Sequence, residues 1–403
     1  MKIISAKYIL TCNEKFEILE DQAICFDKKI IDIDSLEVLK KSYPKAEVIK
    51  NRTNTVLMPG LINAHVHLEF SANRDTLKYG DFISWLKSVI EYRDELNSEC
   101  QDRCIKDALE TIKKSGTTTI GAISSFGVDL EDCVNSPISV VYFNEVLGSN
   151  PAAVDALYAD FYGRLELCKK YKSPNFIPAI SIHSPYSTHP ILAKKALSIA
   201  KDEDMIVSTH FMESKAERDW IDSGNGDFVE FFAPFAPYAK PVNKPISYIE
   251  LFSEVKTLFT HVTKAEDKEL ERIQEIGNIT HCPLSNRLLG NGKLDISKID
   301  NFTLATDGLS SNNSLNMWDE MRGALMMHHE IEPNELAQKL LKASTIHGAL
   351  ALNLNKGVIQ NDKDADFIVV ELDKEIKDIS NLPLSMVLHT KNVKESWIDG
   401  KLI

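Results

Sequence analysis

Eight short apolar runs alternate with stretches of helical period through the middle of this 403-residue chain. Each run has the length and composition of a buried strand, and the stretches between the runs are long enough for crossover helices. Strands that alternate with helices in this way form a parallel sheet. Eight of them, with no Gly-rich phosphate-binding turn after any strand, favour a (β/α)8 TIM barrel over an open doubly wound sheet. The runs are TVLMPGLINAHVHL, TTTIGAI, SVVYFNEV, FIPAISIH, MIVSTHF, KTLFTHVT, NITHCPL and FTLATDG.

The two ends of the chain differ from this middle part. Residues 1–56 and 357–403 are rich in short β-like runs, with little helical signal apart from a stretch near Leu36 to Ser42. A barrel typically takes about 250 residues, which leaves enough chain for a second, smaller unit. We expect residues 57–356 to form the barrel and the two ends to meet in one small sheet domain.

Composition limits the partners of the protein. The formal net charge of -13 works against binding to nucleic acid or to an anionic membrane surface. No run approaches the ~20 apolar residues of a membrane span, and the N-terminal residues lack the apolar region of a signal peptide. The seven cysteines are an odd number and include no CxxC pair. This pattern is typical of a protein whose cysteines are reduced thiols. We therefore expect a cytoplasmic protein that binds a small molecule.

Two histidines at alternate positions of the first run, His65 and His67, are the strongest local signal. Side chains alternate along a strand, so both imidazoles point to the same side. At the carboxyl end of a barrel strand, that side is the mouth where active sites lie. Two converging imidazoles supply half of a metal site. Taken alone, however, such a pair is more often two ordinary histidines on one strand face.

Polar side chains at the ends of three further strands favour a metal site over two ordinary histidines. His210 ends one apolar run and is followed three residues later by Glu213, while His261 and Asp307 end two others. Buried imidazoles and carboxylates without partners cost several kcal/mol, so packing alone does not explain such groups on four separate strands. The sequence predicts that they converge at the barrel mouth.

All of these residues except His261 lie within longer segments that resemble the amidohydrolase superfamily. The similarity is to the branch that contains cytosine, guanine, chloro-s-triazine and S-adenosylhomocysteine deaminases, and it spans most of the barrel. The β-rich ends also resemble the composite β-sandwich domain of that branch. The matching segments are PGLINAHVH, FISWL at 82–86, SIHSPYS at 181–187, STHFMESKAE at 208–217, HCPLSNRLLG at 281–290 and TDGLSSNNSLNMWDEM at 306–321.

The resemblance implies a single divalent metal ion. Its ligands would be His65, His67, His210 and Asp307. Two-metal relatives carry a carbamylated lysine at the end of strand four, where this chain reads FIPAISIHSPYS and offers His183 but no lysine. We expect zinc, and iron and manganese also suit three imidazoles and one carboxylate.

The same resemblance implies a hydrolytic deaminase that uses metal-activated hydroxide. Asp307 would take the proton from the attacking water and later deliver a proton to the departing ammonia. Glu213 would protonate the ring nitrogen beside the attacked carbon. His261 would hydrogen-bond the hydroxide and stabilise the tetrahedral intermediate. Neither Glu213 nor His261 would be a permanent ligand.

The segment LEFSANRDTLKYGDFISWLKSVIEYRDEL narrows the substrate. It resembles the 6-aminodeoxyfutalosine deaminases, which serve the futalosine route to menaquinone and act on an adenine nucleoside that bears a carboxyphenyl ketone. A substrate carboxylate favours an arginine partner, for which Arg74, Arg93 and Arg287 are candidates.

Two other residues are candidates for substrate binding. His183 would contact the ribose or a substituent, although it would equally suit a residue that orients a metal ligand. Trp85 would form a pocket wall, but an aromatic at helical spacing is more often part of a core. We expect His281 to be structural.

Several alternatives stay open. The branch includes S-adenosylhomocysteine, methylthioadenosine, adenosine and guanine deaminases, but the ribose-binding glutamate that follows the FxxWL helix in the first two does not align with the run from Glu91 to Glu95. A cyclic amide hydrolase of the imidazolonepropionase type would use the same scaffold, and assembly proteins of the superfamily have lost their ligands. The HxE…PCxxC signature of nucleic-acid-editing deaminases is absent. Homodimers are common in the family.

Overall fold

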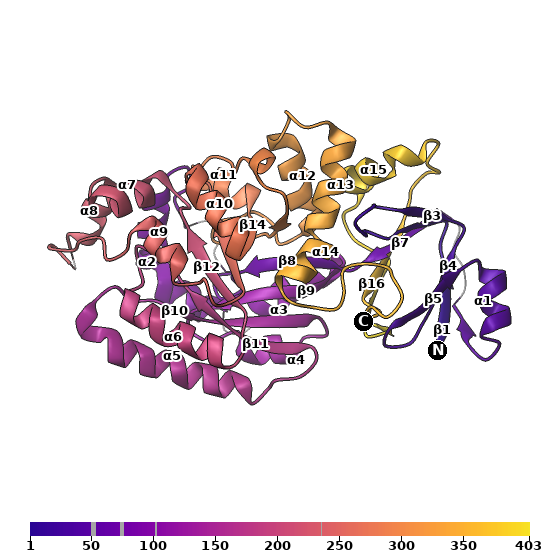
Figure 1. Cartoon of the computed structure of the whole chain (residues 1–403), viewed down its shortest axis with the longest axis horizontal. Coiled ribbons are helices and arrows are strands. Elements are labelled where there is room, and N and C mark those ends of the chain that lie inside the picture. Colours follow the sequence, from indigo (N-terminus) through magenta and orange to yellow (C-terminus); the bar gives the residue numbers. More distant parts are fainter. Residues whose placement is uncertain (50–53, 73–75, 101–102, 235) are drawn as a thin grey trace.

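A computed structural model of the chain describes residues 1–49, 54–72, 76–100, 103–234 and 236–403. Its centre is one sheet of eight parallel strands in sequence order, the arrangement of a (β/α)8 barrel (Figure 1). The predicted TIM barrel is therefore confirmed. The strands are β8 Leu61–Val66, β9 Thr117–Ser124, β10 Ser139–Val146, β11 Phe176–Ile182, β12 Val207–Phe211, β13 Thr257–His261, β14 Gly277–His281 and β15 Phe302–Leu304.

Helices cover the outside of the barrel and bury one apolar face each. In α3, for example, Ile105, Ala108, Leu109 and Ile112 recur at helical spacing and are buried against the sheet. The helices that follow the strands are α2 Phe82–Cys100, α3 Cys104–Lys114, α4 Leu130–Asn135, α5 Val154–Lys169, α6 Pro190–Asp202, α7 Lys215–Ser223, α8 Asp227–Phe232, α9 Pro245–Glu250, α10 Asp267–Ile276, α11 Pro283–Leu288, α12 Met317–Met327, α13 Pro333–Ala343 and α14 Ile346–Ala351.

The first predicted run divides into two strands that belong to different sheets. β7 (Thr55–Pro59) pairs with strands from the chain ends, and β8 begins the barrel after Gly60. A Cβ at Gly60 would lie 2.1 Å from Thr118 Oγ1, so only glycine permits this close approach. Periodicity alone does not reveal the division, because both strands are fully buried.

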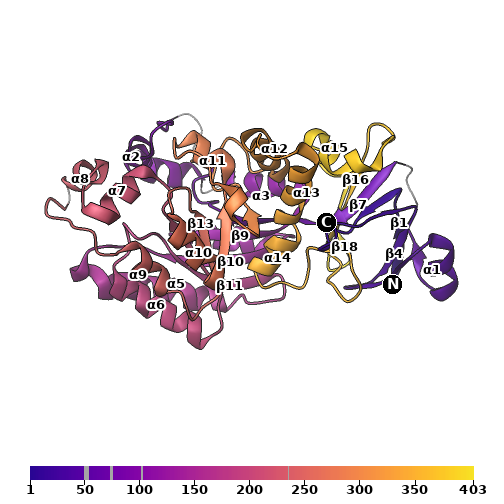
Figure 2. The ribbon, with the colours of Figure 1, turned by 45° about the horizontal axis from the view of Figure 1, so that its top comes forward.

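The chain ends form two further sheets, which lie beside the barrel together with both termini (Figures 1 and 2). Their strand orders are β18-β17-β16-β7-β2-β3 and β5-β4-β1-β6. An aromatic cluster of Phe26, Phe367 and Trp397 lies in the core between them. The strands are β1 Lys2–Ser5, β2 Tyr8–Leu10, β3 Ile18–Glu20, β4 Ala23–Phe26, β5 Ile30–Asp34, β6 Glu47–Val48, β16 Phe367–Glu371, β17 Glu395–Ile398 and β18 Lys401–Leu402, with helices α1 Leu36–Ser42 and α15 Leu382–His389.

A buried ion pair joins the end sheets to the barrel. Lys356, which follows α14, pairs with Asp366 just before β16, and both side chains are buried. Lys356 Nζ also donates to Ser139 Oγ at 3.0 Å, and Asp366 Oδ1 accepts from the backbone N–H of Asp399 at 2.9 Å. The charges are thus enclosed by hydrogen bonds on both sides. Within the described part of the chain, no helix is both long enough and apolar enough to span a membrane.

Candidate active site

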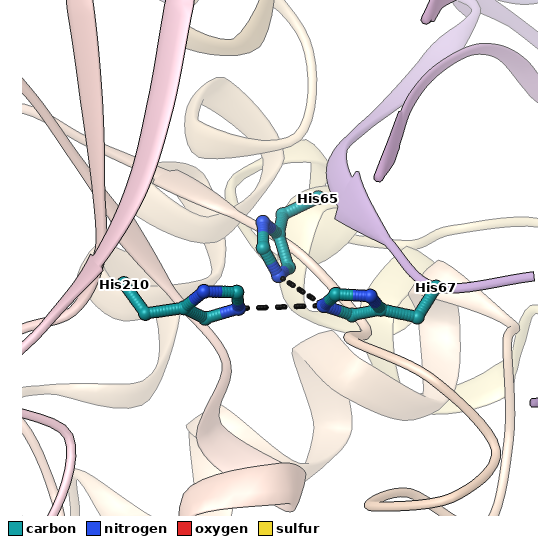
Figure 3. A group of neighbouring side chains, drawn as sticks. All are labelled: His65, His67 and His210. Carbon is teal, nitrogen blue, oxygen red and sulfur yellow. Dashed lines mark hydrogen bonds between the residues drawn. The ribbon is translucent and has the colours of Figure 1, made fainter. Parts of the chain in front are cut away.

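Three imidazoles converge at the carboxyl ends of β8 and β12 (Figure 3). His67 Nε2 lies 3.1 Å from His65 Nε2 and 3.3 Å from His210 Nε2. Asp307 Oδ1 lies 3.7 Å from His65 Nε2 and 3.5 Å from His67 Nε2. Metal–nitrogen bonds of about 2.0–2.1 Å in a tetrahedral zinc site separate the ligand atoms by about 3.3–3.4 Å. The three imidazoles therefore have the spacing of ligands to one ion, and Asp307 lies beside two of them.

Hydrogen bonds on the far side of two rings aim them at a common point. His210 Nδ1 lies 2.8 Å from the carbonyl oxygen of His183, and His65 Nδ1 lies 3.4 Å from Thr260 Oγ1. If each Nδ1 donates its proton there, both Nε2 lone pairs face His67 Nε2, and one proton on His67 cannot satisfy both. A cation satisfies all three nitrogens. Burial lowers the pKa of His67 and His210, which keeps these rings in the neutral form that binds metal.

Asp307 is oriented by two serine hydroxyls. Ser285 Oγ and Ser311 Oγ each donate to Asp307 Oδ2 at 2.7 Å, which leaves Oδ1 directed at His65 and His67. Burial by itself would raise the pKa of Asp307, but the hydrogen bond to His65 and the neighbouring imidazoles hold this pKa well below its ordinary value. The carboxylate is therefore ionised and suited to a cation.

Glu213 lies two residues beyond β12 and is buried. Its Oε1 accepts from Asn291 Nδ2 at 3.2 Å, and its Oε2 lies 3.6 Å from His261 Nε2. Burial, and then the negative charges of Asp307 and Glu217, raise the pKa of Glu213 well above its ordinary value. This shift favours the protonated carboxyl, the form that can donate a proton.

His261, the last residue of β13, is held by Asn286. Its Nδ1 lies 2.9 Å from Asn286 Oδ1, an arrangement in which Nδ1 carries the proton and Nε2 carries the lone pair. Burial lowers the pKa of His261 to about 4, so the ring is neutral at pH 7. His261 Nε2 lies 4.0 Å from Asp307 Oδ2 and can accept a hydrogen bond in the space between them.

Left-handed backbone conformations cluster at these strand ends. The φ angles are 46° at Met212, 72° at His261, 54° at Val262 and 59° at Asp307. Such angles are uncommon outside glycine and are costly for a β-branched valine. Strain of this kind persists only where the surrounding structure fixes it, which is common at functional sites. Here it turns the chain sharply just where each functional side chain leaves its strand.

The polar cluster forms the floor of a pocket of about 500 Å³. This size is within the usual range for small-molecule sites. The outer part of the pocket is apolar, and Trp85, whose Nε1 donates to Ser310 O at 2.8 Å, fixes α2 against it. The apolar lining consists of Phe70, Phe82, Trp85, Leu86, Val89, Ile90, Phe126, Leu147, Tyr186, Phe231 and Phe232.

The structure places only some of the candidate substrate-binding residues beside the pocket. Trp85, His183 and Arg93 border the pocket. Arg287 does not border it and is exposed in the last turn of α11, because the helix directs the preceding Ser285 and Asn286 inward. Arg74 lies outside the described residues.

His281, which we expected to be structural, lies outside the pocket lining, and several residues that support the site were not predicted from the sequence. His281 is buried with its Nε2 3.1 Å from His328 Nε2, and it is not in the pocket lining. Sequence reasoning gave no role to Asn286, Asn291, Ser285 and Ser311, although all four lie in or beside the segments that carry the family resemblance. It also missed Glu145, which borders the pocket at the end of β10.

Comparisons with known proteins identify the family of this chain. The model of the amidohydrolase family matches residues 56–403. The chain is 47% identical over 404 residues to an aminodeoxyfutalosine deaminase of Nitratiruptor sp., covering 100% of this chain and 99% of that protein. It is 36% identical to an adenosine deaminase of Helicobacter pylori, with 100% and 99% coverage. The crystal structure of Helicobacter pylori aminofutalosine deaminase in complex with methylthio-coformycin superposes with a TM-score of 0.95, at 34% identity and full coverage of both chains.

The chain belongs to the amidohydrolase family. The predicted family and the predicted class of enzyme, a hydrolytic deaminase, are both confirmed. Members of this family typically bind a divalent metal ion, and two sets of side chains at this site could hold one: His65, His67 and His210, and His65, His261 and Asp307.

Proposed function

We propose that this enzyme deaminates the adenine ring of 6-aminodeoxyfutalosine, giving deoxyfutalosine and ammonia in menaquinone biosynthesis. One observation carries the proposal: a cluster of potential metal ligands and the buried carboxyl of Glu213, whose pKa is raised, share one pocket with a largely apolar lining that includes Arg93. The full-length similarity to an aminodeoxyfutalosine deaminase at 47% identity supports it.

We propose that His65, His67, His210 and Asp307 hold one divalent ion, with zinc as the first candidate and iron or manganese as alternatives. When bound, such an ion supplies an acidified water and a local positive charge. The set His65, His261 and Asp307 also has the proximity of metal ligands, and it shares two of these four residues. A third set, Glu145, His183 and His210, shares His210, whose Nδ1 faces the His183 carbonyl, so it lacks an independent set of ligands.

The chain's own residues move the protons. Asp307 accepts a proton from the attacking water, and the lone pair of His261 Nε2 orients that water towards C6 of adenine. Glu213 donates its proton to ring nitrogen N1 as the C6–O bond forms. Asp307 then returns its proton to the amine, the C6–N bond breaks, and the remaining hydroxyl proton restores Glu213. The net change is water and an amidine converted to a ring carbonyl and ammonia.

The outer pocket suits the rest of this substrate. An aromatic ring stacks well on Trp85, Phe82 and their apolar neighbours. Arg93 borders the same wall, where a guanidinium can pair with the aromatic carboxylate. We therefore propose Arg93, rather than Arg287, as the partner of that group.

A second candidate substrate is adenosine itself. The relative that is 36% identical over the full chain is an adenosine deaminase, and it would use the same polar floor. Adenosine carries no carboxyphenyl group for the apolar wall and no carboxylate for Arg93. The two candidates therefore differ in how much affinity they draw from the outer pocket.

The test is an ammonia-release screen on the metal-loaded protein, with metal content measured on the same sample. The substrates are 6-aminodeoxyfutalosine, adenosine, S-adenosylhomocysteine, 5′-methylthioadenosine, guanine and imidazolone propionate. We expect the highest kcat/KM for 6-aminodeoxyfutalosine. The proposal fails if the protein contains its metal and another substrate is clearly preferred, or if no ammonia appears from any purine.

A further inference from the structure

Glu145 is a buried carboxylate in the pocket wall that the steps above do not use. It is the last residue but one of β10, and its side chain borders the pocket although the residue is only 1% exposed. Its Oε2 accepts from Ser125 Oγ at 2.5 Å and its Oε1 accepts from Ser181 Oγ at 3.2 Å. A carboxylate offers about four acceptor positions. The two serines use two, so Glu145 retains acceptor capacity.

His183 stands beside Glu145 on the next strand of the barrel. A carboxylate oxygen of Glu145 and ring nitrogens of His183 and His210 all lie within 4.8 Å of one another. His183 Nδ1 contacts Ser187 Oγ at 2.6 Å and Ser184 Oγ at 3.1 Å, which fixes the ring and leaves its Nε2 for other partners. Glu145 and His183 thus form a polar pair in a pocket wall that is otherwise largely apolar.

This pair lies on a different side of the pocket from the catalytic groups. Glu145 and His183 come from β10 and β11, while Glu213 follows β12 and Asp307 follows β15. The His210 ring lies between, with its centroid 5.0 Å from that of His183 and 5.5 Å from that of His261. A ligand whose base meets Glu213 therefore presents its next group to Glu145 and His183.

An ionised carboxylate needs hydrogen-bond donors, and an imidazole can serve as donor or acceptor. On an adenine nucleoside, the 2′ and 3′ hydroxyls of ribose are the donors next to the base. We infer that Glu145, with His183 beside it, binds the vicinal diol of the ribose and so selects ribonucleosides over deoxyribonucleosides. The inference rests on the proposed function for its substrate class, an adenine nucleoside.

The expected size of this effect follows from the kind of bond. Hydrogen bonds to a buried charged group are the stronger class, and losing one weakens binding by about 10- to 100-fold. Glu145→Ala removes the acceptor, whereas Glu145→Gln keeps a neutral acceptor and the same shape. The serine hydroxyls can rotate to suit an amide, so Glu145→Gln is expected to fold like the native chain.

The test measures calorimetric binding of inosine, 2′-deoxyinosine and 3′-deoxyinosine to zinc-loaded protein. We expect the native protein to bind inosine at least about tenfold more tightly than one of the deoxynucleosides. In Glu145→Ala this ratio should fall to about two or less, chiefly through weaker inosine binding, with Glu145→Gln in between. The matched control is Glu269→Gln, another buried glutamate, which pairs with Arg218 on the outer layer and should keep the native ratio.

Three results would overturn the inference: equal affinity of the native protein for the three nucleosides, an unchanged ratio in both Glu145 variants, or a second bound ion that is lost from them. Ammonia release from 6-aminodeoxyfutalosine and from adenosine, measured in parallel, separates this inference from the proposed function. Loss of the binding ratio in the Glu145 variants without deamination of either substrate by the native enzyme supports the inference and refutes the function. No binding of any of the three nucleosides, with deamination of 6-aminodeoxyfutalosine intact, refutes the inference alone.

Discussion

Replacing Glu213 by glutamine isolates the proton that this residue is proposed to give to the ring. Burial and the nearby charges of Asp307 and Glu217 raise the pKa of Glu213, which favours its protonated form. Glutamine keeps the acceptor for Asn291 Nδ2 and can donate a hydrogen bond, but it cannot transfer a proton. General acid–base catalysis contributes about 10²–10⁴-fold. We therefore expect kcat to fall by that factor, which corresponds to about 3–5 kcal/mol of transition-state stabilisation.

The remaining properties of Glu213→Gln should change little. Glu213 is not among the four proposed ligands, so metal content should stay at the native level. The substitution keeps the size and shape of the buried side chain, and we expect the free energy of unfolding to change by less than about 1 kcal/mol. The assay couples ammonia release to a dehydrogenase, with elemental analysis and thermal unfolding on the same preparation and Glu269→Gln as control. A kcat within about threefold of native, with metal intact, would refute this role; joint loss of metal and activity would instead make Glu213 a ligand.

Three further outcomes follow from the structure. Arg93→Gln removes the proposed charge-assisted bond to the substrate carboxylate, so the KM for 6-aminodeoxyfutalosine should rise by about 10–100-fold. The kcat/KM for adenosine, which has no carboxylate, should stay within about twofold of native. Equal losses for both substrates would contradict the carboxylate contact. Lys356→Met leaves Asp366 buried without its partner, so denaturant unfolding should show that the free energy of unfolding falls by about 3–5 kcal/mol. The double variant Lys356→Met/Asp366→Leu should largely recover this free energy. A fall below about 1 kcal/mol in the single variant would contradict the importance of the ion pair. Burial raises the pKa of Glu320 to about 8, and its unfolded value is about 4.3, so the folded state retains a proton that the unfolded state releases between these values. Stability should therefore decline from pH 5 to pH 8 relative to Glu320→Gln, and parallel profiles would count against the buried proton.

The barrel was predictable because its strands are both regular and buried. All eight runs that the sequence marks contain a barrel strand, from β8 to β15. The grouping of polar side chains at the barrel mouth could also be predicted, because the carboxyl ends of parallel strands meet at one face. His65, His67, His210 and Asp307 could thus be placed together without knowing any distance. The division of the chain at residues 57 and 356 stays a prediction, and β7 crosses its first boundary by pairing with the end sheets.

The supporting residues could not be predicted in the same way. Asn286 and Ser285 face the site because the short helix α11 follows β14 there. The sequence pattern alone does not distinguish these two inward-facing residues from the exposed Arg287. Glu145 lies inside a fully buried strand, where a single carboxylate interrupts the apolar pattern and gives no sign of a function. Its significance appears only when β11 brings His183 alongside. Such roles depend on contacts between strands, which periodicity does not contain.

The position of the metal-ligand cluster also has a structural logic. Among the described residues, β8 and β15 end the sheet order, and no strand ladder joins them. The barrel closes instead through the backbone N–H of Asp307, which donates to His65 O at 3.1 Å, and through mutual hydrogen bonds of Asn63 and Thr306 at 2.6 and 3.1 Å. Two proposed ligands from the first strand and one from the last lie directly on this seam. An ion held there would link the same two strands a second time, so the groups that serve the chemistry would also complete the barrel.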